Sequence, residues 1–296
     1  MEYQFQGVCP VINLPFDQDN AIDYDGMAAV IEKSIADGCE SLCLFAFNTE
    51  PHKLTTQEKK DTIVKFLDIT KGRVSTLVGI VENAIFGCIE LAQLVESNGG
   101  DGIILYPPAL STPSGQVLLN YFKAIAQSVD IAVMIQDNPR STGVQMPMEL
   151  LLDAYRSIDN FNYIKVECPI PVRKMRKLID LTDGKLKCYS GNGGIFAMDA
   201  FGAGAWGIMP GSVAAGRFVR LHKLYMAGKI AEARDIFENI LPLVWYEDQS
   251  LEFYIACEKE LLCNMGVIEH GHLRPPGETL SDTDKKELYA LYDRLK

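Results

Sequence analysis

Short apolar runs rich in β-branched residues alternate with segments of helical period along the first three quarters of the chain. Eight such strand–helix units fit within residues 1–225. A closed parallel barrel of this kind takes about 250 residues. An open doubly wound sheet usually carries a glycine-rich phosphate loop after its first strand, and none follows the first apolar run at residues 8–14. The sequence therefore predicts an α/β fold, a (β/α)8 TIM barrel.

Local signals set the limits of several predicted helices. Thr55-Thr56-Gln57-Glu58 forms a capping box that begins a helix running to about residue 70. Gly38 is expected to end the helix before it. From residue 214 onward only helical patterns follow. We therefore expect a barrel domain over residues 1–225 and a C-terminal helical region over residues 226–296.

Composition and charge exclude several classes of partner. The net charge of −11 and the pI near 4.9 argue against a nucleic-acid partner. No apolar run approaches the roughly 18 residues that span a bilayer, so no membrane partner is expected. Residues 1–6 lack the basic and apolar regions of a signal peptide. The expected location is therefore the cytoplasm.

The cysteine and histidine patterns do not predict a metal site. The eight cysteines are scattered through apolar segments without a Cys-x-x-Cys pair, which is typical of reduced, buried thiols. His270 and His272 could ligate a metal, but no acidic or thiol cluster accompanies them, and a loop is the preferred interpretation. We expect neither a metal nor a cofactor.

Lys165 interrupts an apolar run at residues 162–168 that otherwise predicts a buried strand. Burying an ammonium group costs several kcal/mol unless it is paired or loses its proton. An unprotonated amine is a nucleophile. A lysine can instead extend to solvent from an edge strand, or pair with Glu167. In a barrel this run is the sixth strand, so Lys165 and Glu167 share an inward face, as do Met134 and Gln136 on the fifth.

Active sites of such barrels are built at the carboxyl ends of the strands. Polar side chains near these ends are the candidates for a functional site. They are Asn13, Asn48, Thr49, Tyr106, Gln136, Lys165, Glu167, Ser190 and Asn192.

Motifs along nearly the whole chain resemble one superfamily of barrel enzymes. They are Ile164-Lys165-Val166-Glu167 on the sixth strand, Phe47-Asn48-Thr49-Glu50 in the place of a carboxylate-binding loop, Asn138-Pro139-Arg140-Ser141-Thr142-Gly143 after the fifth strand, and Tyr189-Ser190-Gly191-Asn192-Gly193-Gly194 and Ile208-Met209-Pro210-Gly211 on the last two strands. The chain resembles the class I aldolase-type superfamily of dihydrodipicolinate synthase and N-acetylneuraminate lyase. The resemblance implies a lyase whose Lys165 forms a Schiff base with a 2-oxo acid substrate.

Glu167 is the expected acid/base, with a simple ion pair to Lys165 as the alternative. Asn48 and Thr49 are expected to hold the substrate carboxylate. Gln136 and Asn192 are expected to bind sugar hydroxyls, although Gln136 could be a structural polar group. Members of the superfamily commonly form tetramers, so a homo-oligomer, tetramer or dimer, is expected.

Ser190 is a further substrate-binding candidate, and its hydroxyl could instead satisfy the neighbouring backbone.

Two departures from the superfamily pattern refine the expected reaction. Gln136 stands where most members have a proton-shuttling tyrosine, and Pro107-Pro108-Ala109-Leu110-Ser111 lacks the second tyrosine. The pattern VMIQDNP at residues 133–139, YIKVECP at 163–169, PLVWYEDQS at 242–250 and GVIEHGHLRPP at 266–276 is instead similar to the branch of 2-keto-3-deoxy-L-arabonate dehydratase and related sugar-acid dehydratases. That similarity implies dehydration of a 2-keto-3-deoxy sugar acid, such as 2-keto-3-deoxy-L-arabonate to α-ketoglutarate semialdehyde.

Three other outcomes stay open. A pyruvate-dependent aldolase or synthase shares the imine but acts on the C3–C4 bond. A deaminase of a cyclic imino acid would release ammonia. A catalytically silent barrel would bind sugar acids without a covalent adduct.

Overall fold

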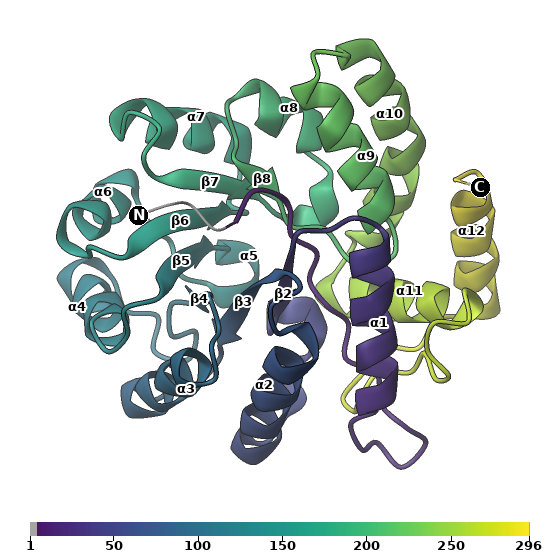
Figure 1. Cartoon of the computed structure of the whole chain (residues 1–296), viewed down its shortest axis with the longest axis horizontal. Helices are drawn as coiled ribbons and strands as arrows, with labels where there is room; N and C mark the ends of the chain where they lie inside the picture. Colours follow the sequence, from purple (N-terminus) through teal and green to yellow (C-terminus); the bar gives the residue numbers. More distant parts are fainter. Residues whose placement is uncertain (1–4, 296) are drawn as a thin grey trace.

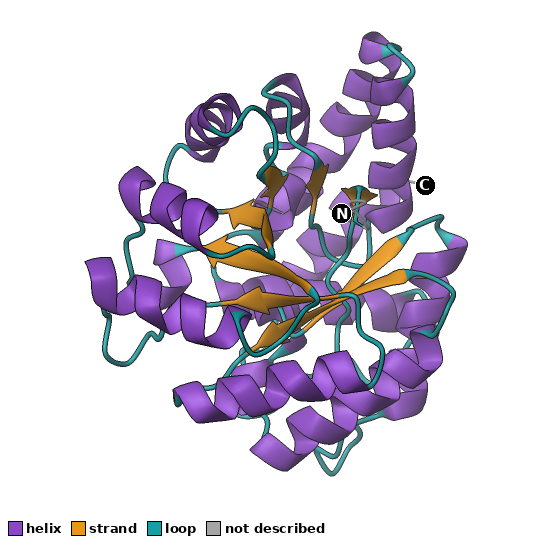
Figure 2. Ribbon diagram, turned by 60° about the vertical axis from the view of Figure 1, so that its left-hand side comes forward, coloured by secondary structure: helices purple, strands orange, loops and turns teal. Residues whose placement is uncertain are grey.

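Eight parallel strands form a nearly closed barrel surrounded by helices in the computed structural model, which describes residues 5–295 (Figures 1 and 2). The strands are β1 (Gly7–Val8), β2 (Ser41–Leu44), β3 (Ser75–Ile80), β4 (Gly102–Leu105), β5 (Ala132–Asp137), β6 (Phe161–Val166), β7 (Lys187–Ser190) and β8 (Gly207–Ile208). β1 pairs with β8, and the remaining strands pair in chain order down to β2. The predicted (β/α)8 fold is confirmed.

The barrel closes through the chain that follows β1. Ile12 N donates to Cys43 O at 2.8 Å, and Cys43 N donates to Pro10 O at 2.9 Å. The regular strand is nevertheless shorter than the run predicted at residues 8–14. Pro10 has no N–H group to donate, so the pairing beyond Val8 is reduced to isolated bridges at Val11.

Helices follow the strands and cover the outside of the barrel (Figure 2). They are α1 (Tyr24–Ala36), α2 (Thr56–Thr70), α3 (Ile85–Ser97), α4 (Gly115–Ala126), α6 (Met148–Ser157), α7 (Pro171–Leu181), α8 (Ala197–Gly202) and α9 (Ala215–Met226), with short turns at η1 (Phe47–Thr49), η2 (Pro51–Lys53), α5 (Pro139–Thr142) and η3 (Asn192–Gly194). The capping box at Thr55 is present: Glu58 N donates to its Oγ1, and Thr55 N donates to the Glu58 carboxylate. These short turns lie in the loops after β2, β5 and β7, where the site is expected.

Aromatic side chains fill the interior of the barrel below the carboxyl ends of the strands. The ring of Tyr163 lies 5.2 Å from that of Phe5 and 6.2 Å from that of Tyr189, both in edge-on geometry. Met134 and Leu77 pack into the same cluster. Residues two apart on a strand share a face, so Lys165 faces the same interior as Tyr163 and lies two residues closer to the carboxyl end of β6.

Three further helices extend the chain beyond the barrel: α10 (Ile230–Glu247), α11 (Leu251–Asn264) and α12 (Asp282–Asp293). α10 packs along α9 (Figure 1). α11 contacts both α10 and η1. The C-terminal helices therefore reach the mouth of the barrel. The division between a domain of residues 1–225 and a region of residues 226–296 stays a prediction.

No helix within residues 5–295 has both the length and the apolar character needed to cross a membrane. Residues 1–4, on which the expected lack of a signal peptide partly depends, lie outside the described part of the chain.

Candidate active site

Lys165 lies at the carboxyl end of β6 and points into a cavity at the mouth of the barrel. Its side chain is 5% exposed, and Nζ lies 3.3 Å from Glu167 Oε1. Gln136 of β5 is its neighbour in the sheet register. Five of the residues predicted from sequence line this cavity together: Asn48, Gln136, Lys165, Glu167 and Asn192.

Glu167 is held by four contacts. Its Oε2 accepts hydrogen bonds from Gln136 Nε2 at 2.5 Å and Asn138 Nδ2 at 3.0 Å. Its Oε1 accepts from the backbone N–H of Asn192 at 2.9 Å and faces Lys165 Nζ. The ion pair considered as an alternative for Glu167 is therefore present. The same geometry also keeps one carboxylate oxygen next to the amine, which is where a proton-transfer group for chemistry at Lys165 has to lie.

Asn48 and Thr49 occupy the turn η1 after β2, but only Asn48 lines the cavity. The Thr49 side chain is fully buried: Oγ1 donates to Ile12 O at 2.8 Å and accepts from Phe45 N at 3.1 Å. These bonds tie the turn to the segment that follows β1 and to the residue directly after β2. The structure thus places Thr49 as a support of the turn that presents Asn48.

Gln136 and Ser190 both carry a buried oxygen without a hydrogen-bond partner among residues 5–295. For Gln136 this atom is Oε1, and the residue lines the cavity, so an acceptor is available there. Ser190 follows Tyr189 on β7 and is fully buried outside the cavity lining. The structure does not bring Ser190 together with the other candidates.

The turn between α10 and α11 supplies part of the cavity wall that the sequence did not predict. Asp248, Ser250 and Leu251 line the cavity there, opposite Arg140 of α5. Arg140 donates to the Asp248 carboxylate at 3.1 Å, and to the carbonyl oxygens of Asp248 and Gln249 at 3.0 and 2.9 Å. Burial raises the pKa of Asp248, and the Arg140 guanidinium partly offsets this. The rule that active-site residues follow barrel strands could not identify Asp248, Ser250 and Leu251, because these three residues lie where α10 ends and α11 begins.

Tyr254 of α11 was also missed, and it is the one tyrosine of the cavity lining within the described residues. Its ring packs on the backbone of Gly193, where an added Cβ would lie 3.1 Å from the ring. Burial, with the neighbouring Glu258 and Glu247, raises the pKa of Tyr254 well above its usual value. The phenol is therefore a hydrogen-bond donor at neutral pH rather than a base.

Within residues 5–295, no group of three or more His, Cys, Asp or Glu side chains is arranged to hold a metal ion. The rings of His270 and His272 lie 6.2 Å apart in the segment after α11.

The dihydrodipicolinate synthetase family model matches residues 4–294. A 4-hydroxy-tetrahydrodipicolinate synthase from Phocaeicola vulgatus is 26% identical over 300 residues, covering 100% of this chain and 99% of that protein. One from Oceanobacillus iheyensis is 28% identical over 242 residues, covering 81% of each chain.

Solved structures match over almost the full length as well. Dihydrodipicolinate synthase from Rhodopseudomonas palustris superposes with a TM-score of 0.92 at 26% identity, over 99% of this chain and 98% of that one. A prophage protein of the dihydrodipicolinic acid synthase family from E. coli K12, solved in complex with pyruvate, gives 0.93 at 25% identity, over 99% of both chains. With the barrel, the buried lysine and these matches in agreement, the chain belongs to the dihydrodipicolinate synthetase family.

Proposed function

We propose that this protein is a lyase that forms a Schiff base between Lys165 and the ketone of a 2-oxo acid. The observation that carries the proposal is the position of Lys165 Nζ, buried in the cavity at the end of β6 and 3.3 Å from a carboxylate oxygen of Glu167. The E. coli relative solved with pyruvate supports a 2-oxo acid as ligand.

The mechanism follows from what an amine in this position does. Unprotonated Lys165 attacks the C2 carbonyl carbon, and loss of water gives an iminium that acidifies the C3 protons. Glu167 takes the C3 proton, and the electron pair of the C–H bond moves into the enamine. Gln136, Asn138 and the Asn192 N–H hold Glu167 in place for this transfer.

The remaining predicted residues are assigned to substrate binding. Asn48 holds the substrate carboxylate from the η1 turn, with Thr49 supporting that turn. Gln136 Oε1 and Asn192 accept and donate hydrogen bonds to substrate hydroxyls. Ser190 stays the weakest of the candidates, because its buried hydroxyl is outside the cavity lining.

For the reaction outcome we infer dehydration of a 2-keto-3-deoxy sugar acid, such as 2-keto-3-deoxy-L-arabonate. The enamine expels the C4 hydroxyl, which leaves as water with the proton that Glu167 took from C3, and hydrolysis of the remaining iminium frees Lys165. This elimination requires no base on the C4 hydroxyl. Aldol cleavage does require such a base, and the amide of Gln136 stands where a tyrosine would supply it. This supports elimination over cleavage.

A condensing or cleaving reaction is the second candidate. The 4-hydroxy-tetrahydrodipicolinate synthase names of the relatives favour it. It would use the same imine and form or break the C3–C4 bond.

Borohydride trapping separates these outcomes. Wild-type protein, incubated with pyruvate or with a panel of 2-keto-3-deoxy acids and reduced, should gain the mass of the ligand on Lys165, and Lys165→Arg should not. Release of pyruvate from the panel would identify an aldolase, and release of ammonia from a cyclic imino acid a deaminase. Absence of any wild-type adduct would leave a binding protein.

We also propose a homo-oligomer, tetramer or dimer, located in the cytoplasm. Sedimentation equilibrium of the purified protein measures the oligomeric state, and cell fractionation measures the location.

A further inference from the structure

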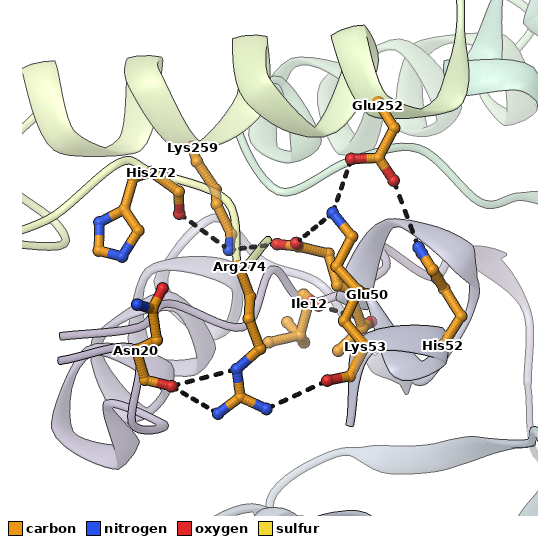
Figure 3. A network of polar contacts seen from close by, with 10 residues as sticks. Ile12, Asn20, Glu50, His52, Lys53, Glu252, Lys259, His272 and Arg274 are labelled. Atoms are coloured by element: carbon orange, nitrogen blue, oxygen red, sulfur yellow. Dashed lines mark hydrogen bonds and ion pairs between the residues drawn. The ribbon is translucent and has the colours of Figure 1, made fainter. Parts of the chain in front are cut away.

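A polar network joins α11 to the turn that carries Asn48 (Figure 3). Its centre is the carboxylate of Glu50, which is fully buried. Oε1 accepts from Lys259 Nζ of α11, whose side chain is 0% exposed, and Oε2 accepts from Lys53 Nζ at 2.9 Å. Lys53 continues the network to Glu252 of α11 at 2.6 Å. Two residues of α11 therefore hold the turn through one buried acid.

Lys259 is fixed on its other sides as well. Its Nζ lies 4.3 Å from the ring centroid of Phe16, and Arg274 lies 4.6 Å from the same ring. Nζ also donates to the carbonyl oxygen of His272 at 3.4 Å. Among the residues that the structure describes, Glu50 at the end of the turn is the one carboxylate that pairs with this ammonium group.

The backbone of Glu50 explains why the turn needs such a partner. Glu50 has φ 59° and ψ 37°, in the left-handed region that side chains other than glycine rarely adopt. Glu50 adopts this conformation directly after η1, whose Asn48 lines the cavity. A residue held there by a buried ion pair cannot relax to a right-handed conformation without exposing an unpaired charge in the interior.

We propose that Lys259 and Glu50 are positioning residues for substrate binding: their buried ion pair fixes the η1 turn and so the atoms of Asn48 that receive the substrate carboxylate. This assignment rests on the proposed function, because it concerns the carboxylate subsite of that reaction. It makes α11 part of the substrate site, although no residue of the pair touches the substrate.

Protonation of Lys259 provides a second readout. Burial lowers the pKa of Lys259 to about 8, and Glu50 partly offsets this. The charged and titratable groups that face Lys259 or its aromatic contact are Glu50, Lys53, Glu252, His272 and Arg274. As pH rises through 8, Lys259 loses its charge and the pair with Glu50 weakens. The wild-type turn then approaches the behaviour of a variant that lacks the ammonium.

The test is the pyruvate concentration that gives half-maximal borohydride trapping, measured on the full chain. At pH 7, Lys259→Met should raise this concentration about 10-fold, with the trapping rate at saturating pyruvate within about twofold of wild type. Lys285→Met, which removes a 2.9 Å ion pair between α12 and Glu260 of α11, is the matched control and should not change it. Between pH 7 and 9, the ratio of variant to wild type should fall toward one.

If Lys259→Met does not fold, Glu50→Gln/Lys259→Met removes both buried charges and gives the same measurement. Half-saturation equal to wild type in either variant, or a ratio that does not change with pH, would overturn the positioning role while leaving the Schiff base intact. Absence of a pyruvate adduct in the wild-type protein would overturn the proposed function, and the positioning role with it. Loss of the saturating rate without a change in half-saturation would also contradict positioning, since it would indicate a purely structural pair.

Discussion

Gln136 of β5 lies directly beside Lys165 of β6, and its amide donates to the carboxylate that faces the Lys165 amine. A phenol in this place could carry a proton between substrate and solvent. An amide does not exchange a proton at neutral pH, so the Gln136 side chain acts on Glu167 through its hydrogen bond alone. In this structure the Gln136 amide therefore orients Glu167, the residue that we propose as the acid/base for the imine.

Glu167→Gln tests that role. The amide keeps the shape of the side chain but cannot take a proton, so the borohydride adduct on Lys165 should still form. Turnover of the 2-keto-3-deoxy acid should fall by roughly 10²–10⁴-fold, the usual contribution of general acid–base catalysis. Mass spectrometry measures the adduct, and product formation measures turnover. A variant that retained more than a tenth of the turnover would rule out Glu167 as the proton acceptor.

Gln136→Met and Gln136→Glu form a graded pair. Methionine removes one charge-assisted donor to Glu167, worth roughly 1.5–3 kcal/mol, and should lower turnover about 10- to 100-fold. Glutamate places a second carboxylate against Glu167, where the amide contact is 2.5 Å. The turnover of Gln136→Glu should therefore fall further than that of Gln136→Met at neutral pH, and less in acid, where one of the two carboxyls is protonated. Steady-state rates across pH 5–8 distinguish them. Equal losses at every pH would show that charge at this position is unimportant.

Arg140→Ala tests whether the α10–α11 turn contacts the far end of the substrate. The turn is tied to α5 by the bonds from Arg140 to Asp248 and the adjacent carbonyl groups. Releasing the turn should raise KM for five- and six-carbon acids about 10-fold, because Asp248 and Ser250 line the cavity and are the polar groups that we expect to bind the distal hydroxyls. Arg140→Lys keeps the charge but loses the forked geometry of the guanidinium, so its KM should lie between those of the wild type and Arg140→Ala. A KM that changes equally for pyruvate would point instead to a general opening of the cavity.

A buried pair of glutamates should make stability depend on pH. Glu247 of α10 is fully buried with both carboxylate oxygens unpartnered within residues 5–295, and Glu258 of α11 accepts from Val213 N. Burial raises the pKa of Glu258 to about 7, and burial with the charge of Glu258 raises that of Glu247 well above its usual value.

The folded state thus retains protons that the unfolded chain releases near pH 4.3. The free energy of unfolding that depends on these protons is therefore fully present below pH 4.3 and is lost as pH rises through 7. Glu247→Gln should therefore gain Tm over wild type by several degrees at pH 8 and show little difference at pH 4.5. Calorimetry at the two pH values measures it. A constant difference would mean that the pair does not titrate on unfolding.

The barrel and the lysine were predictable because strand periodicity is local. Two-residue alternation places Lys165, Gln136 and Glu167 toward one interior without any knowledge of the loops. The wall formed by the α10–α11 turn has no such signal. Arg140 and Asp248 are 108 residues apart, and their contact depends on how α10 packs along α9, which a single sequence does not encode in any short pattern.

Thr49 shows the same limit on a smaller scale. The motif correctly placed the turn after β2, since Asn48 lines the cavity. Which of two adjacent polar side chains faces the cavity depends on the exact dihedral angles of η1, and the hydroxyl of Thr49 bonds to Ile12 instead.

The buried pair of Glu50 and Lys259 has a consequence for biosynthesis, because 209 positions separate the two residues. During translation, Glu50 emerges from the ribosome long before Lys259. While α11 is still inside the exit tunnel, the Glu50 carboxylate has the ammonium of Lys53 beside it but lacks that of Lys259, so its Oε1 has to stay hydrated. A nascent chain whose strands have already assembled would therefore complete this buried network only after α11 has emerged from the ribosome.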